Sequence, residues 1–155
     1  MDEILKKLLL EEDELQFTKF NEEIAWKIGS ELVKQAVTKS LPITIDITRG
    51  DHQIFHASQP GTSADNDEWV KRKTRLVYRF GHSSYYIGQL LKSKGQNLED
   101  AYLISENHFA PHGGCFPIIV CGTGMVGTIT VSGLAQKEDH QLVVQAIREY
   151  LSHEN

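Results

Sequence analysis

The sequence predicts an α+β fold, in which helices flank a sheet of antiparallel strands. Two observations predict it. Apolar residues recur at three- and four-residue spacing in several stretches, and they alternate with polar residues in others. The alternating stretches come as pairs joined by short turns, with helical stretches before, between and after them. This order favours hairpins over a parallel, doubly wound sheet.

The first half of the chain contains one helix and one hairpin. Asn21 can cap the helix, and the acids Glu22 and Glu23 suit the positive end of its dipole. Three isoleucines then alternate with Thr and Asp, as in a half-buried strand. The expected elements are a helix over 21–40, strands over 43–48 and 53–57 around a turn at 49–51, and a loop over 58–66.

The second half contains two central helices, a second hairpin and a closing helix. Asp67 is the expected cap of the first helix, and Gly81 breaks it before Ser83 or Ser84 starts the next. The expected elements are helices over 67–79 and 83–91, a loop at 95–97, strands over 116–121 and 126–132 around a turn at 122–124, and a helix over 136–151.

Charge is unevenly distributed along the 155 residues. The chain has 16 Lys and Arg against 21 Asp and Glu, for a net charge of −5. Residues 1–15 hold six acids and two bases, so the remainder is nearly neutral. We expect one domain over 1–155, with 1–15 as an acidic N-terminal segment. That segment is interpreted as a solvated helix or turn, or as a contact arm for a partner subunit.

Composition excludes several classes of protein. No apolar run approaches the roughly 20 residues of a membrane span. The acidic total disfavours nucleic-acid binding. The start, Met1-Asp2-Glu3, lacks the basic region of a secretory signal, and the two cysteines are too few for a disulfide framework. We therefore expect a cytoplasmic protein that binds neither membranes nor nucleic acid.

The main electropositive feature lies in residues 71–79, which hold five bases and no acid. Three of the arginines are three and four positions apart, which places them on one face of a helix. Guanidinium groups match the oxygens of carboxylates and phosphates. The alternatives are pairing with the protein's own acids or a subunit contact. The candidate ligand-binding residues here are Arg72, Arg75, Arg79, Ser83 and Ser84.

A second candidate site lies between residues 106 and 114. Glu106, His108 and His112 form the densest set of metal ligands, although Pro111 disfavours a continuous helix that would align the two rings. The alternative is an exposed polar loop without metal. Either imidazole could instead approach a haem iron. Gly113 and Gly114 could cradle an anion or lie against a planar ligand, or could simply form a turn.

Three other features are interpreted as structural. Glu138, Asp139 and His140 are consecutive on a helix and cannot converge, so helix-dipole stabilisation explains the two acids. Trp69 is expected to pack, and Cys115 is expected to be a buried, inert thiol.

Several motifs taken together carry a family resemblance. They are Gly-Gly-Cys-Phe-Pro-Ile (113–118), Gly-Thr-Gly-Met-Val-Gly-Thr-Ile-Thr-Val-Ser-Gly-Leu (122–134) and Gln-Lys-Glu-Asp-His (136–140). This series resembles the haem-degrading-domain family of GlcG and HbpS. Trp-x-x-Arg-Lys (69–73) and Arg-Phe-Gly-x-Ser-Ser (79–84) resemble its uncharacterised bacterial and fungal branch. The resemblance implies a profilin-like three-layer α/β/α sandwich with a central antiparallel sheet, homo-oligomers and, in some relatives, binding of haem or iron.

Three functions are ranked from these observations. The first is binding of a small anionic ligand, either haem or a carboxylate. The second is a non-catalytic oligomeric adaptor, in which Phe17 and Phe20 contribute to a subunit surface. The third is a metal-assisted enzyme built on Glu106, His108 and His112.

Overall fold

A five-stranded sheet lies at the centre of the protein, in a computed structural model that describes residues 2–154. The strand order is β1-β4-β5-β2-β3. All neighbours pair antiparallel except β1 and β4, which are parallel. The strands are β1 (Gln16–Phe17), β2 (Thr44–Arg49), β3 (His52–Ser58), β4 (Cys115–Val120) and β5 (Gly124–Ser132).

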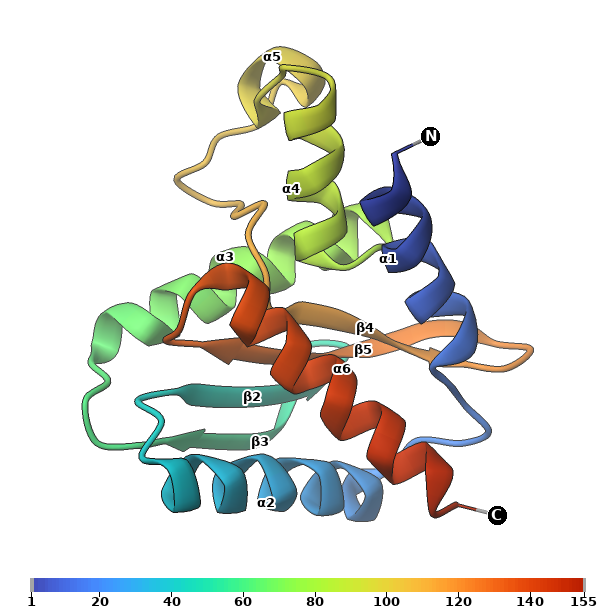
Figure 1. The fold of residues 1–155 in the computed structure, drawn as a ribbon, viewed down its shortest axis with the longest axis vertical. Coiled ribbons are helices and arrows are strands. Elements are labelled where there is room, and N and C mark those ends of the chain that lie inside the picture. Colours follow the sequence, from blue (N-terminus) through green and yellow to red (C-terminus); the bar gives the residue numbers. More distant parts are fainter. Residues whose placement is uncertain (1, 155) are drawn as a thin grey trace.

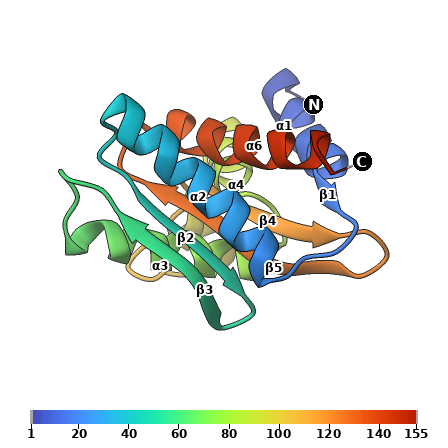
Figure 2. The same ribbon diagram turned by 90° about the horizontal axis from the view of Figure 1, so that it is seen from below.

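Helices cover both faces of the sheet, and the predicted three-layer α/β/α sandwich is confirmed. Helices α2 (Glu22–Lys39) and α6 (Gln136–Ser152) form one outer layer, and α3 (Ala64–Phe80) lies on the opposite side (Figures 1 and 2). The remaining helices are α1 (Glu3–Glu14), α4 (Ser84–Ser93) and α5 (Leu98–Tyr102). None of the helices within residues 2–154 has the length and apolar character needed to cross a bilayer.

The two faces of the sheet differ sharply in polarity, because successive side chains of a strand point to opposite sides. The apolar face carries the buried residues Ile45, Ile47, Phe116, Ile118, Ile129 and Val131, which pack in one core with α2 and α6. The polar face, under α3, carries Thr44, Asp46, Thr48, Thr128, Thr130 and Ser132, all nearly inaccessible except Thr48. Any functional cleft between α3 and the sheet is therefore lined by polar groups.

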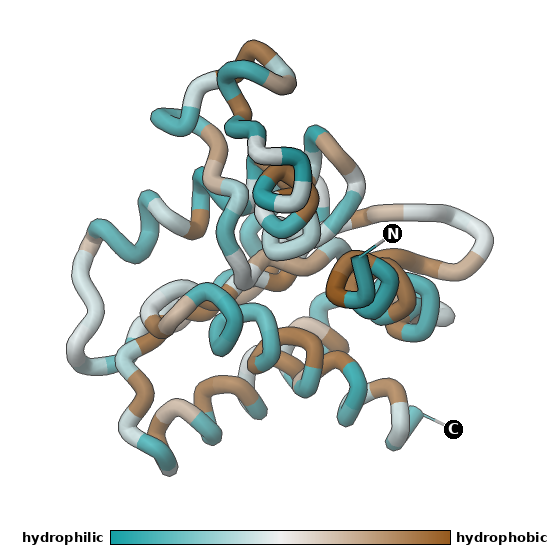
Figure 3. The backbone as a smooth tube through the Cα atoms, turned by 45° about the horizontal axis from the view of Figure 1, so that its top comes forward, coloured by the Kyte–Doolittle hydropathy of each residue, from teal (hydrophilic) through white to brown (hydrophobic). Residues whose placement is uncertain are grey.

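Helix α1 is more than the solvated segment that its charge suggested. Leu5 and Leu8 pack in a second hydrophobic cluster with α3, α4 and α5, and the helix is amphipathic along its length (Figure 3). Two of its acids are buried: Glu11 lies 2.8 Å from the His140 ring, and Glu12 lies 2.7 Å from the His82 ring. These contacts use acidic side chains that were expected to face solvent.

The predicted subunit surface at Phe17 and Phe20 is also wrong in part. Phe17 is fully buried, and its ring meets that of Phe20 edge to face, with centroids 5.4 Å apart. Both rings belong to the apolar core, so they contribute to stability within the chain.

The expected helices and hairpins are present, with shifts at their ends. Helix α3 begins earlier than expected, because a capping box formed by Ser63 and Asn66 precedes the predicted cap Asp67. Gly81 ends α3 with φ 72°, a conformation that glycine adopts at little cost. Two short elements, β1 and α5, were not expected, since two and five residues carry no visible periodicity.

Candidate functional site

Helix α3 covers the polar face incompletely, which leaves two clefts. The lysine cleft has a volume of about 380 Å³ and lies between the first half of α3, the 112–113 segment and the β5–α6 connection. The histidine cleft has a volume of about 730 Å³ and lies between α3 and the β2–β3 hairpin. The lysine cleft is lined by Asp65, Asn66, Trp69, Lys73, His112, Gly113, Ser132, Gly133, Leu134, Gln136 and Asp139.

Lys73 contributes a buried amine to the lysine cleft. Its side chain is 4% exposed, and its Nζ donates to the carbonyl oxygen of Val131 at 3.2 Å and to Asp139 Oδ2 at 3.4 Å. Burial lowers its pKa, although the neighbouring carboxylate acts in the opposite direction. An ammonium has three N–H donors, so these two acceptors leave one donor available to a ligand.

Asp139 holds the cleft together from the first turn of α6. Its Oδ1 accepts from the backbone N–H of Leu134 at 2.9 Å, and its Oδ2 accepts from that of Gly133 at 3.2 Å. Burial raises the pKa of this carboxyl to about 6, against the opposing effects of Lys73 and the two backbone donors. The interpretation of Asp139 as a helix-dipole residue is therefore incomplete, since it also bridges β5, α3 and α6.

Aromatic rings form one wall of the cleft. Trp69 and His112 meet edge to face with centroids 5.8 Å apart, and the Arg72 guanidinium lies 4.5 Å from the centre of the Trp69 ring. Burial lowers the pKa of His112, so its imidazole is neutral at pH 7. Trp69, which was expected only to pack, thus also forms part of a cleft wall.

The glycine pair allows close packing of the 113–114 segment against α6. A Cβ at Gly113 would lie 2.2 Å from the carbonyl oxygen of Gln136, and one at Gly114 would lie 2.7 Å from the Cβ of Asp139. The Gly113 N–H donates to the Gln136 side chain at 3.2 Å. Gly113 lines the cleft, whereas Gly114 supports it by letting Asp139 approach.

The three predicted arginines share one side of α3 and contact the 106–109 segment. Arg72 donates twice to the carbonyl oxygen of Glu106, at 2.9 and 2.6 Å, and Arg75 donates to that of His108 at 3.4 Å. The Arg79 guanidinium lies 5.8 Å from the Phe109 ring. In this structure the three arginines contact the 106–109 loop and hold it in place. The sequence predicted a ligand, the protein's own acids or a subunit contact as their partners, and this loop was not among them.

The predicted serines Ser83 and Ser84 lie in the interior. Both are fully buried. The Ser83 hydroxyl accepts from the backbone N–H of Tyr86 and caps α4, while the Ser84 hydroxyl accepts from the N–H of Cys115 at 3.0 Å. Neither serine lines the lysine cleft, and both hydroxyl groups are engaged in hydrogen bonds within the chain.

The predicted metal set is not assembled. Glu106 and His112 line a small cleft of about 250 Å³, but the exposed His108 does not. Within residues 2–154, no group of three His, Cys, Asp or Glu side chains is arranged so that it could hold a metal ion. The chain around Pro111 is not helical, as the effect of proline on helices predicts, so a spacing of four residues does not align the two rings. Cys115 is buried as expected, and burial raises the pKa of its thiol to about 12.

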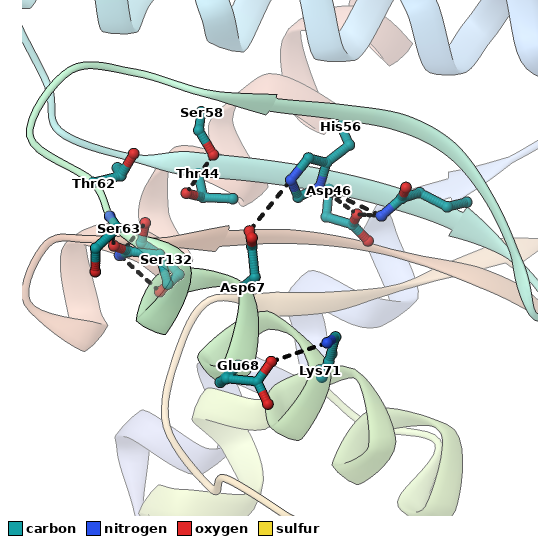
Figure 4. Close-up of polar contacts among 12 residues, drawn as sticks. Thr44, Asp46, His56, Ser58, Thr62, Ser63, Asp67, Glu68, Lys71 and Ser132 are labelled. Atoms are coloured by element: carbon teal, nitrogen blue, oxygen red, sulfur yellow. Dashed lines mark hydrogen bonds and ion pairs between the residues drawn. The ribbon is translucent and has the colours of Figure 1, made fainter.

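The histidine cleft contains a cluster that the sequence did not indicate. His56 lies between two carboxylates, with Nδ1 2.9 Å from Asp46 Oδ1 and Nε2 3.3 Å from Asp67 Oδ1 (Figure 4). Gln53 also donates to Asp46 Oδ1, at 2.6 Å. The cluster joins the β2–β3 hairpin to α3.

The sequence did not show that Lys73 and Asp139 are partners, although the spacing of apolar residues around Lys73 indicated that its side chain is buried. Val70, Lys73 and Val77 are spaced three and four apart, and all three are buried against the sheet. A charged residue on the apolar stripe of a helix must find a partner in the interior. Asp139 is 66 residues away in sequence, and only the fold brings the two together.

Comparisons with known proteins agree with this architecture. The profile of the family described as "Haem degrading protein HbpS-like" matches residues 20–148. The chain belongs to the HbpS-like family. A UPF0303 protein of Streptomyces coelicolor, SCO2848, is 45% identical over 144 residues, covering 92% of this chain and 91% of that protein. The family resemblance read from the motifs is therefore confirmed.

Solved structures show the same fold. The crystal structure of the Ybr137w protein aligns with a TM-score of 0.89 and 28% identity, covering 97% of this chain and 88% of that one. The crystal structure of a PduOC–heme complex aligns with a TM-score of 0.68 and 15% identity, covering 83% of this HbpS-like chain and 93% of that one. At that identity, the second likeness concerns the fold alone.

Proposed function

We propose that this HbpS-like protein binds a small organic carboxylate in the lysine cleft. The observation that carries the proposal is Lys73, a buried amine with two intramolecular acceptors at a cleft open to solvent. A carboxylate oxygen would take its third N–H as a charge-assisted hydrogen bond. In a partly desolvated cleft, that interaction is stronger than on the surface.

The surroundings of Lys73 favour a compact ligand. The cleft volume of about 380 Å³ is near the lower end of the roughly 300–1,000 Å³ typical of ligand pockets. Trp69 offers an apolar surface to the hydrocarbon part of a ligand, and the nearby Arg72 adds a second positive charge. The acids Asp65 and Asp139 oppose multiply charged anions, so a ligand with a single carboxylate suits the cleft best.

Backbone amide NMR tests this proposal, with propionate and pyruvate as probes. We expect saturable shifts of the amide signals of Gly113, Gly133 and Leu134, which surround the cleft. Lys73→Met should abolish these shifts, whereas Lys71→Met, an exposed lysine on the same helix, should leave them unchanged. The proposal is wrong if neither probe produces saturable shifts at these amides.

Haem is a second candidate ligand, favoured by His112. A neutral imidazole is the form that ligates iron, and burial keeps His112 neutral at pH 7. The family description and the heme complex of PduOC support this candidate. The cleft volume does not favour it, because a porphyrin would extend well beyond about 380 Å³ of space. His112 would hold the haem iron, and the iron would supply the redox or ligand-binding chemistry.

Titration with haemin separates the two candidates. If haem binds through His112, the Soret band shifts with saturation, and His112→Ala removes the shift. His108→Ala serves as the matched control, because His108 is exposed and does not line the lysine cleft. A Soret shift that both variants retain, or no shift in the wild type, would rule out His112 as a haem ligand.

A further inference from the structure

We propose that Lys73 forms a reversible imine with the carbonyl carbon of a small 2-oxo acid or aldehyde, with Asp139 exchanging the proton. This inference deepens the proposed function, on which it rests, by naming the class of ligand that the cleft captures. The inference concerns a covalent bond between Lys73 and the ligand. It can therefore be wrong even if the protein binds carboxylates non-covalently in the lysine cleft.

The hydrogen bonds of Lys73 suit a neutral amine as well as an ammonium. A neutral amine has two N–H donors and one lone pair. The two acceptors found, the carbonyl oxygen of Val131 at 3.2 Å and Asp139 Oδ2 at 3.4 Å, match the two donors. With those bonds kept, the lone pair is the one remaining position on Nζ and is available to a carbonyl carbon.

The electrostatic surroundings reduce the cost of removing the proton from Lys73. Burial lowers the pKa of the Lys73 amine and raises that of the Asp139 carboxyl to about 6, so the two values approach each other. His112 and Cys115 also face this pair, from the preceding loop and from β4. At pH 7 the His112 ring and the Cys115 thiol are both neutral, so neither adds a charge that stabilises the ammonium.

The reaction balances without any further reagent. Asp139 accepts a proton from the Lys73 ammonium, and the neutral amine turns about its Cε–Nζ bond so that it again donates to both acceptors and its lone pair faces the ligand. The lone pair then forms the C–N bond at the carbonyl carbon. A proton moves from nitrogen to oxygen, which gives a neutral carbinolamine. Asp139 then returns its proton to the hydroxyl group, which leaves as water while C=N forms. The net change converts one ammonium and one carbonyl into one protonated imine and one water, and hydrolysis reverses it.

Trapping with borohydride tests the inference. The folded wild-type protein is mixed with pyruvate at pH 7, reduced with sodium borohydride and digested for peptide mass mapping. Reduction converts the imine into a stable secondary amine that stays on the modified lysine. We expect labelling at Lys73 to exceed that at the exposed Lys71, because burial lowers the pKa of Lys73 and a larger fraction of it is the neutral amine.

Matched controls make the result specific. Propionate carries the same carboxylate without a carbonyl carbon, so it should give no adduct and should protect Lys73 from pyruvate. Lys73→Arg keeps the positive charge but cannot form an imine, and it should lose the Lys73-containing adduct while Lys71 remains reactive. Circular dichroism checks that this variant is folded. The labelling of the wild-type protein tests the inference even if the variant does not fold.

The outcomes separate the two proposals. Saturable amide shifts with pyruvate but equal labelling of Lys73 and Lys71 would overturn the imine and leave carboxylate binding intact. No shifts and no selective labelling would overturn both. Selective labelling of Lys73 that propionate does not reduce would support the imine and contradict the carboxylate contact.

Discussion

The two faces of the central sheet use the same strands for different purposes. Neighbouring residues such as Ile129 and Thr130 are both fully buried, yet Ile129 joins the core under α2 and α6 while Thr130 lies under α3. Thr130 Oγ1 is 3.4 Å from that of Thr74 on α3, and on the same face Thr48 Oγ1 is 2.8 Å from that of Thr128. One face is closed by apolar packing and the other by hydrogen bonds.

This difference explains why the clefts lie on the polar face. Apolar side chains pack to high density, and few voids remain between them. Hydrogen-bonding groups need directed contacts, and α3 satisfies some of them and leaves the others at the two clefts. The comparison teaches that apolar packing under α2 and α6 contributes most to stability, while α3 borders the two clefts in which a ligand could lie.

The largest expected effect on stability comes from truncating a side chain on the apolar face of the sheet. Ile129→Ala should lower the free energy of unfolding by about 2–5 kcal/mol through lost burial and a cavity. Thr130→Ala, one residue away on the other face, should cost about 1 kcal/mol, because it removes one long hydrogen bond. Urea denaturation of both variants measures the difference. Equal losses would contradict the assignment of stability to the apolar face.

An intermediate effect concerns the pH dependence of stability at Asp139. Its pKa in the folded protein, about 6, lies above the ordinary 3.8, because the carboxyl is buried. Between pH 4 and 6 the folded state therefore holds more protons than the unfolded state, and the contribution of this group falls as pH rises. The wild type should lose on the order of 2 kcal/mol relative to Asp139→Asn across this window. A constant difference in urea denaturation from pH 4 to pH 6.5 would contradict this origin.

The smallest effect concerns the rim of the polar face. Arg72→Ala removes two hydrogen bonds to the Glu106 carbonyl oxygen and the contact with Trp69, and it should cost about 1 kcal/mol. Hydrogen exchange should rise in residues 106–109. Lys71→Ala, which loses an exposed ion pair with Glu68, should change stability by less than about 0.5 kcal/mol. Unchanged exchange in Arg72→Ala would show that the arginines do not hold this loop.

Sequence patterns predicted most of the fold because periodicity is local. The apolar spacing after Asn21 and the alternation around Ile45 are visible within single elements. The parallel strand β1 has two residues and depends on pairing with β4, about 100 positions away in sequence. No local pattern could show it.

The candidate site was less predictable, because its contacts join distant segments. His112 and Gly113 were expected to bind a ligand, and they line the lysine cleft. The arginines were correctly placed on one face of a helix, but their contacts with the 106–109 segment depend on tertiary structure. Lys73 and Asp139 each resemble ordinary helix charges until the fold brings them within 3.4 Å.

A crystal structure of the protein soaked with propionate tests the central account most directly. The account predicts a propionate carboxylate oxygen within hydrogen-bond distance of Lys73 Nζ, with its methyl group toward Trp69. Propionate found only in the histidine cleft, or an empty lysine cleft at saturating propionate, would contradict it.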